Sequence, residues 1–165
     1  MGDGLHLRAE DAEDLRVMSS FLQDALVPLA DMHFEPAERR FVLALNRFRW
    51  EHVVAGQGGA GQGRAGQVGA RQVGARFERI ASGVAFEAVH RVRLQNIERA
   101  RRDRPLELLA VVARDEGEAG ATIQLMFAGG GTIRLEAERI RVRLDDFGEP
   151  WPTRWAPRHR DPGEF

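Results

Sequence analysis

The chain has 165 residues, of which 43% are hydrophobic and 30% charged, as expected for one globular domain with an apolar core. Its 24 basic and 25 acidic residues give a formal net charge of -1, so no general attraction to nucleic acid or anionic lipid is expected. All basic residues are arginine, and the chain contains no lysine, cysteine or tyrosine. This chain therefore supplies no Schiff-base lysine, thiol nucleophile, thiolate metal ligand or Walker-type lysine.

Neither a membrane span nor a signal peptide is predicted. The chain lacks a run of about 18 apolar residues, and its first residues form neither a basic nor an apolar segment. We therefore expect a cytoplasmic protein. The pattern indicates no cofactor.

The first predicted elements are a short alternating segment at residues 5–8 and an amphipathic helix that runs to about residue 25. Asp11 is the expected N-cap, because acidic residues follow it and stabilise the first turn of a helix. Apolar residues recur at spacings of three and four along the helix, which gives one core-facing stripe. These residues are Leu15, Met18, Leu22 and Ala25.

A hairpin is predicted next, with strands at residues 27–34 and 40–51 around a turn at 35–38. Because side chains alternate along a strand, the second strand has two distinct faces. One face holds Val42, Ala44, Asn46, Phe48 and Trp50, and the other holds Phe41, Leu43, Leu45, Arg47 and Arg49.

Residues 55–75 form a pentapeptide tandem repeat of the type Gly-Gln-x-Gly-Ala. The repeat lacks the large apolar residue that a stacked solenoid needs, so we interpret it as a flexible insertion. Gly56, Gly58 and Gly61 match the spacing of a dinucleotide fingerprint, but no amphipathic helix follows to hold a pyrophosphate.

The second half alternates in the manner of strands. A long, bending strand at residues 80–94, with a bulge at Gly83, precedes an arginine-rich turn at 99–105. Further strands are predicted at 106–113, 122–127, 132–137 and 140–144, and the second and third of these form a hairpin around the turn at 128–131. Residues 149–165 carry four of the seven prolines and are expected to be a tail.

These elements predict an α+β, mainly β domain. The expected architecture is an antiparallel sheet of about seven strands that closes as a barrel or sandwich, with one N-terminal amphipathic helix packed on it. Residues 1–148 would form the globular domain, including the insertion, and the proline-rich tail would follow.

Three candidate sites stand out. Asp31, His33 and Glu35 share one face of a strand, which suits a metal or a shared proton, although a solvated strand face is the alternative. The segment at residues 46–51 combines aromatic and guanidinium groups in a way that suits recognition. There the alternative is a sheet in which the aromatic residues face the core and Arg47 and Arg49 pair with acids across strands.

The only basic cluster is the third candidate. It comprises Arg91, Arg93, Arg99, Arg101, Arg102 and Arg104. It suits a phosphate or RNA, but acidic neighbours and the absence of RNA-motif aromatic residues favour a solvated turn.

Several segments together resemble an uncharacterised family of alphaproteobacterial type whose function is unknown. The resemblance rests on residues 22–25 (LQDA), 31–32 (DM), 38–41 (ERRF), 46–51 (NRFRWE) and 127–131 (FAGGG), and it covers most of residues 5–150. It implies a bacterial setting and supplies no activity. The positions it marks for any shared site are Gln23, Asp24, Asp31, Arg40, Asn46, Arg47 and Trp50.

Two hypotheses for function follow. The first is a non-catalytic domain that binds an unknown protein partner or a second copy of itself through the region of Arg47, Arg49 and Trp50, with no role for nucleic acid or membrane. The second is a small-anion or metabolite binding protein or enzyme that uses Asp31 with His33 or Glu35, and an arginine clamp. The binding residues predicted overall are Asp31, Arg40, Asn46, Arg47, Arg49 and Trp50.

Overall fold

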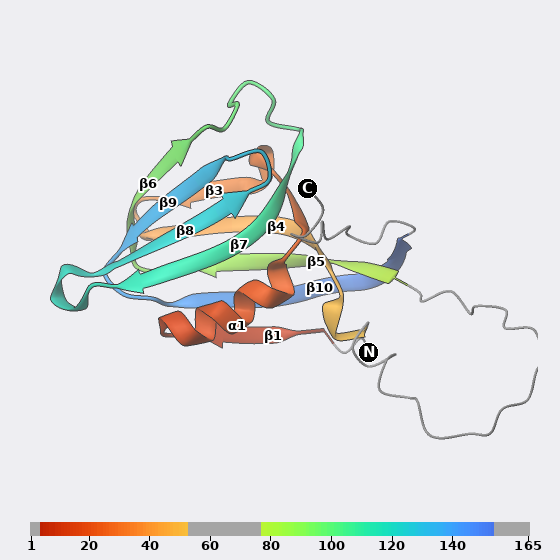
Figure 1. The fold of residues 1–165 in the computed structure, drawn as a ribbon, viewed down its shortest axis with the longest axis horizontal. Helices are drawn as coiled ribbons and strands as arrows, with labels where there is room; N and C mark the ends of the chain where they lie inside the picture. The colour runs from red at the N-terminus through yellow and green to blue at the C-terminus, as the bar shows by residue number, and fades with distance from the viewer. Residues whose placement is uncertain (1–3, 53–76, 154–165) are drawn as a thin grey trace, which may run out of the picture.

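The computed structural model describes residues 4–52 and 77–153 of the chain (Figure 1). Within these ranges the fold is mainly β, as predicted. Its elements are β1 (His6–Ala9), α1 (Ala12–Leu22), β2 (Ala25–Pro28), the 3-10 helix η1 (Leu29–Asp31), β3 (Met32–Glu35), β4 (Arg40–Phe48), β5 (Phe77–Phe86), β6 (Val89–Gln95), β7 (Pro105–Asp115), the 3-10 helix η2 (Gly117–Ala119), β8 (Ala121–Phe127), β9 (Thr132–Ala137) and β10 (Val142–Thr153).

The ten strands form one antiparallel sheet in the order β1-β10-β5-β4-β2-β7-β8-β9-β6, and β3 pairs with β4 outside this path. Figure 1 shows that the sheet is strongly curved, so that β6, β9, β8 and β7 fold over β4, β5 and β10. Since β1 and β6 end the sheet without pairing with each other, the sheet is open. The predicted closure as a barrel or sandwich is not found, and the strands number ten rather than about seven.

Two predicted strands are each divided in the structure, which accounts for part of the difference in strand number. The strand expected at residues 27–34 is interrupted after Pro28 by the turn η1. The strand expected at 80–94 is interrupted at Ala88, whose φ of 57° turns the chain between β5 and β6. Gly83 stays in register between Ala44 and Asp145, so the predicted bulge is wrong there.

Helix α1 begins as predicted. The Asp11 side chain accepts a hydrogen bond of 2.7 Å from the Asp14 backbone N–H, which caps the first turn. Leu15, Met18 and Leu22 are buried, and the helix packs mainly on β7. It ends at Leu22 rather than near residue 25, because the chain turns at Asp24 and enters β2.

The core lies on the concave side of the curved sheet. Alternate residues of β4 and β5 point into it, and β8 and β9 contribute from the opposite wall. The buried side chains from these four strands include Phe41, Leu43, Leu45, Val84, Phe86, Ile123, Leu125, Ile133 and Leu135. The same alternation places Arg47 on this inner face.

Both predicted hairpins are confirmed. Strands β3 and β4 pair around residues 36–39, and β8 and β9 pair around residues 128–131. In the second turn Gly129 and Gly130 have φ values of 87° and 89°, a conformation that L side chains rarely adopt.

The pentapeptide repeat at residues 55–75 lies outside the described residues, as does the tail from residue 154 onward. Residues 149–153 continue strand β10, so this part of the predicted tail is a strand. Residues 151–153 pair with the start of β5 after an irregularity between Phe147 and Trp151. No helix in the described part of the chain combines the length and the apolar character needed to cross a membrane.

Candidate functional site

Arg47 lies in the interior of the protein. Its side chain is 0% exposed and is neutralised by two carboxylates. The guanidinium donates from Nε to Oδ1 of Asp146 over 2.7 Å and from Nη2 to Oε1 of Glu51 over 2.6 Å. A charge this deeply buried is tolerated because its donors meet matching acceptors.

Asp146 holds further hydrogen bonds besides the one from Arg47. Its carboxylate accepts from the Ser82 hydroxyl over 2.6 Å and from the Leu5 backbone N–H over 2.8 Å. Burial alone would raise the pKa of Asp146, but these hydrogen bonds and the Arg47 charge outweigh burial and lower the pKa. The carboxylate is therefore held ionised, as a structural anchor requires.

Arg49 and Trp50 also make contacts inside the protein. Arg49 is 6% exposed and donates from Nη1 to Oε2 of Glu78 over 2.6 Å. The Trp50 indole donates to the Gln23 carbonyl over 2.9 Å, and its ring centre lies 4.6 Å from that of Phe48. The structure thus corrects the prediction of an accessible recognition surface at Arg47 and Arg49, and it matches the alternative in which these arginines pair with acids.

Asp31, His33 and Glu35 are not brought together. Asp31 lies in the turn η1, so the alternation of strand β3 does not extend to it. Glu35 accepts from Arg40 over 2.7 Å, and the His33 side chain is exposed. Within the described residues no three His, Cys, Asp or Glu side chains are placed to hold a metal ion.

Asn46 lies on the exposed face of β4, beside a cluster that the sequence pattern did not indicate. Arg79 donates to the carbonyls of Asn46 and Asp24, each over 3.2 Å. Glu107 is hydrogen-bonded to the Asp24 side chain. Burial, this hydrogen bond and the Asp24 charge together raise the pKa of Glu107, and burial lowers the pKa of Arg79.

A groove beside two unpaired strand edges has the form of a binding site. Strand β3 pairs only with β4, and β6 pairs only with β9, so in the part of the chain that the structure describes each of them has one edge without a strand partner. Residues of both strands line a groove of about 320 Å³, which we call the seam groove. An unpaired strand edge presents backbone N–H and C=O groups that another chain can pair with.

The lining of the seam groove is mostly apolar. Its side chains come from η1, β3, β4, β6 and β9, and they are Leu29, Met32, Phe34, Phe41, Val92, Leu94 and Ile133. Several of these are only partly buried, including Phe34, Val92 and Leu94. The groove therefore continues the core outward to the surface beside the unpaired edges of β3 and β6.

Two arginines of the turn after β6, Arg99 and Arg102, also line the seam groove. Among the described residues no carboxylate forms an ion pair with either of them, whereas Arg101 of the same turn lies 3.6 Å from Glu98. The Arg102 carbonyl accepts from the Ala30 N–H over 2.8 Å, which holds this turn against η1. The predicted arginine cluster is thus divided, and these two members are placed to receive an anionic group beside an apolar groove.

Comparison with known proteins identifies a family. The sequence model of a family described as "Protein of unknown function (DUF2948)" matches residues 5–159. No curated protein and no solved structure matches the chain.

Proposed function

Because the chain belongs to the DUF2948 family, whose function is unknown, we propose a function from its own surface: it is a protein-interaction domain whose seam groove binds an extended, acidic segment of a partner. The unpaired edges of β3 and β6 beside an apolar groove are the observation that carries this proposal. The proposal keeps the predicted role in protein interaction and moves it away from Arg47 and Arg49, which are buried.

The partner segment is proposed to be an added strand beside β6. This strand offers a longer free edge than β3, with seven residues against four. Main-chain hydrogen bonds would give affinity, and alternate side chains of the added strand would enter the groove against Val92 and Leu94. The added strand would also cover an edge that otherwise favours unspecific association.

Charge selects an acidic segment. Arg99 and Arg102 lie at the groove and form no ion pair with a carboxylate of the described residues. Carboxylates of the bound segment would therefore neutralise these two arginines. A second copy of the chain is the other occupant to consider, since it would bring an edge strand of its own.

The test uses a displayed library of random 12-residue peptides, selected on the full chain. We expect peptides in which apolar residues alternate and at least one Asp or Glu is present. Binding should weaken at least tenfold in R99Q/R102Q and change less than twofold in R91Q/R93Q, the matched variant on β6 whose arginines lie outside the groove lining.

Backbone amide signals of residues 90–95 should shift when a selected peptide binds, because this is the edge that is proposed to pair. Selected peptides that bind R99Q/R102Q as well as the parent, or that shift signals elsewhere, would refute the proposal. A concentration-dependent dimer that is abolished by R99Q/R102Q in sedimentation equilibrium would instead identify a second copy as the occupant.

A further inference from the structure

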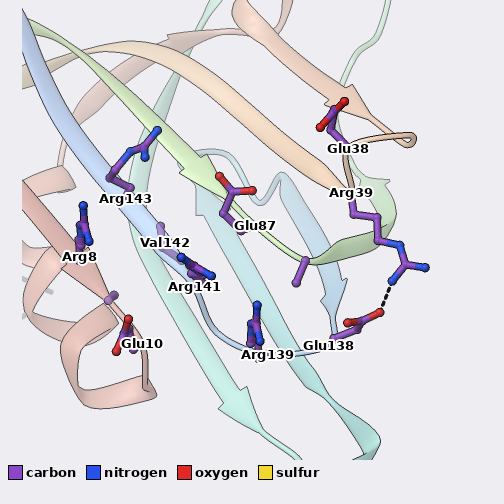
Figure 2. Close-up of a pocket in the computed structure, with 12 residues that line it drawn as sticks. Arg8, Glu10, Glu38, Arg39, Glu87, Glu138, Arg139, Arg141, Val142 and Arg143 are labelled. Carbon is purple, nitrogen blue, oxygen red and sulfur yellow. Dashed lines mark hydrogen bonds and ion pairs between the residues drawn. The ribbon is translucent and has the colours of Figure 1, made fainter.

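A second hollow lies at another end of the sheet and shares no lining residue with the seam groove. It is formed where the end of β1, the β3–β4 turn, the β5–β6 connection and the β9–β10 connection meet, and its volume is about 460 Å³. Figure 2 shows arginine and glutamate side chains around its opening. We call it the arginine cleft, after Arg8, Arg139, Arg141 and Arg143.

Three of these arginines are crowded on one face of the sheet. Arg8 of β1 and Arg143 of β10 lie directly opposite each other in the antiparallel register. The Arg141 carbonyl accepts from the Glu87 N–H over 2.9 Å, which continues the ladder and places Arg141 two residues before Arg143 on the same face. Like charges directly opposite each other across a strand pair are destabilising, so this arrangement calls for a neutralising group.

Side chains of the protein supply only part of that neutralisation. Arg143 lies 2.9 Å from Asp145, and the neighbouring Arg39 pairs with Glu138. No carboxylate of the described residues forms an ion pair with Arg8 or Arg141.

A second pair of opposed arginines in the same sheet has a carboxylate of the protein near both side chains. Arg93 of β6 and Arg134 of β9 also lie directly opposite each other. There Glu136 lies 3.9 Å from each guanidinium, so that the protein provides its own carboxylate between them. The contrast indicates that the arginine cleft is completed by an anion from outside.

We propose that the arginine cleft binds the phosphate group of a small phosphate monoester. Arg8, Arg141 and Arg143 would contact the phosphate oxygens, since guanidinium groups match the geometry and charge of phosphate. The cleft volume lies within the roughly 300–1,000 Å³ of small-molecule sites.

The acidic residues of the cleft restrict the ligand further. Glu10 and Glu87 lie beside the arginines in Figure 2, where they would accept hydrogen bonds from hydroxyl groups of the ligand and repel a second phosphate. Together with the net charge of -1, they disfavour a polyanion such as RNA or an anionic membrane. A hydroxylated monophosphate fits better than a nucleic-acid backbone.

The backbone around the cleft is also fixed in an uncommon conformation. Arg39 and Ala88, which both line it, have φ values of 50° and 57°. Their carbonyls accept from the N–H groups of Val89 over 2.8 Å and Glu138 over 2.9 Å, which ties the three connections together. Residues other than glycine that adopt this left-handed conformation recur at ligand sites, where they pre-organise the surrounding chain.

Binding is tested by NMR spectra of the arginine Nε–H groups of the full chain at pH 7.5 and constant ionic strength. The probes are inorganic phosphate, glycerol 3-phosphate and malonate. We expect saturable shifts confined to Arg8, Arg141 and Arg143, with glycerol 3-phosphate binding most tightly. R8Q/R141Q should weaken binding at least tenfold, and R93Q/R134Q, which removes the other opposed pair, should change it less than twofold.

Both variants replace exposed side chains, and backbone amide spectra will report whether they remain folded. Shifts that are equally large at Arg93 and Arg134, or unchanged affinity in folded R8Q/R141Q, would overturn the site. Malonate that binds as tightly as glycerol 3-phosphate would overturn the assignment to phosphate.

Discussion

Arg47 and Asp146 form a two-bond ion pair inside the sheet, although 99 residues separate them in the chain and neither side chain is more than 1% exposed. They belong to β4 and β10, which flank β5. Ser82 of β5 donates to the same carboxylate, so one network joins three neighbouring strands. Removing Arg47 alone would leave the Asp146 carboxylate buried without its charged partner.

The variant Arg47→Met tests this network. It leaves Asp146 buried without its main partner, so the free energy of unfolding should fall by about 3–5 kcal/mol. Urea denaturation at pH 7 measures the change. Arg40→Met is the matched control on the same strand, because the Arg40–Glu35 pair is partly exposed, and it should destabilise the protein far less than Arg47→Met does.

The double variant R47M/D146L separates the ion pair from its burial. Removing both charges in favour of apolar side chains should recover most of the loss, since the fully buried carboxylate is removed with its partner and the partly exposed Glu51 keeps Arg49 at 3.8 Å. Equal losses in Arg47→Met and Arg40→Met would show that the buried network contributes no more than a surface pair.

Stability should depend on pH through Asp146. Burial raises its pKa, but hydrogen bonds from Arg47, Ser82 and Leu5 lower it below the unfolded value of about 3.9. The stabilisation is therefore complete above that value and is lost as the pH falls through the folded pKa. In urea denaturation from pH 7 to pH 3, the parent should lose more stability than Asp146→Asn, and parallel pH profiles would refute this prediction.

The extent of β4 and the alternation of its side chains could be predicted from the sequence, but the burial of Arg47 could not. Strict alternation placed Arg47 on the face of Phe41 and Leu43, and the structure confirms that grouping. Arginine is rarely buried completely, and the sequence left open whether Arg47 belongs to a recognition surface or pairs with acids across strands. The carboxylates that make burial possible include Asp146, which no local pattern connects to Arg47.

The positions at which the predicted strands are interrupted could also be predicted only in part from the sequence. Pro28 signals the end of β2, since it lacks an N–H group, but Ala88 is an ordinary residue whose left-handed conformation comes from its surroundings. Whether the sheet closes depends on whether its end strands β1 and β6 meet, and this is decided by curvature over the whole sheet. The seam groove and the arginine cleft therefore had no signature in sequence spacing.

Through Glu107, the free energy of unfolding should depend on pH with the opposite sign to its dependence through Asp146. Burial, the hydrogen bond with Asp24 and the Asp24 charge raise the pKa of Glu107 above its usual value, so ionisation of Glu107 disfavours the folded state. This cost is absent below its unfolded pKa of about 4.3 and develops as the pH rises through the folded pKa.

The variant Glu107→Gln should therefore be more stable than the parent at pH 7.5 and should approach it near pH 4. Thermal unfolding followed by circular dichroism measures both. Glu118→Gln, which changes an exposed glutamate of η2, should show no such trend. A Glu107→Gln protein that is less stable at pH 7.5 would mean that the ionised Glu107 contributes more through Arg79 than it loses beside Asp24.

Deleting the pentapeptide repeat should leave stability unchanged or raise it. Strands β4 and β5 are antiparallel neighbours, with Phe48 opposite Arg79 and the Arg49 N–H donating to the Glu78 carbonyl over 2.9 Å. The two ends of the connection are thus already held together. Shortening it from about 24 residues to about 4 would recover up to roughly 1.6 kcal/mol of loop-closure entropy.

Urea denaturation of the deletion variant measures this change. A variant in which a Gly-Ser segment of equal length replaces residues 55–75 is the control, and it should match the parent because only the length of the connection contributes. If the deletion and the Gly-Ser variant both lost several kcal/mol, the repeat would have to make stabilising contacts. If only the deletion did so, the short connection would be straining the Arg49–Glu78 end of the strand pair, and a deletion that keeps about 8 connecting residues should restore stability.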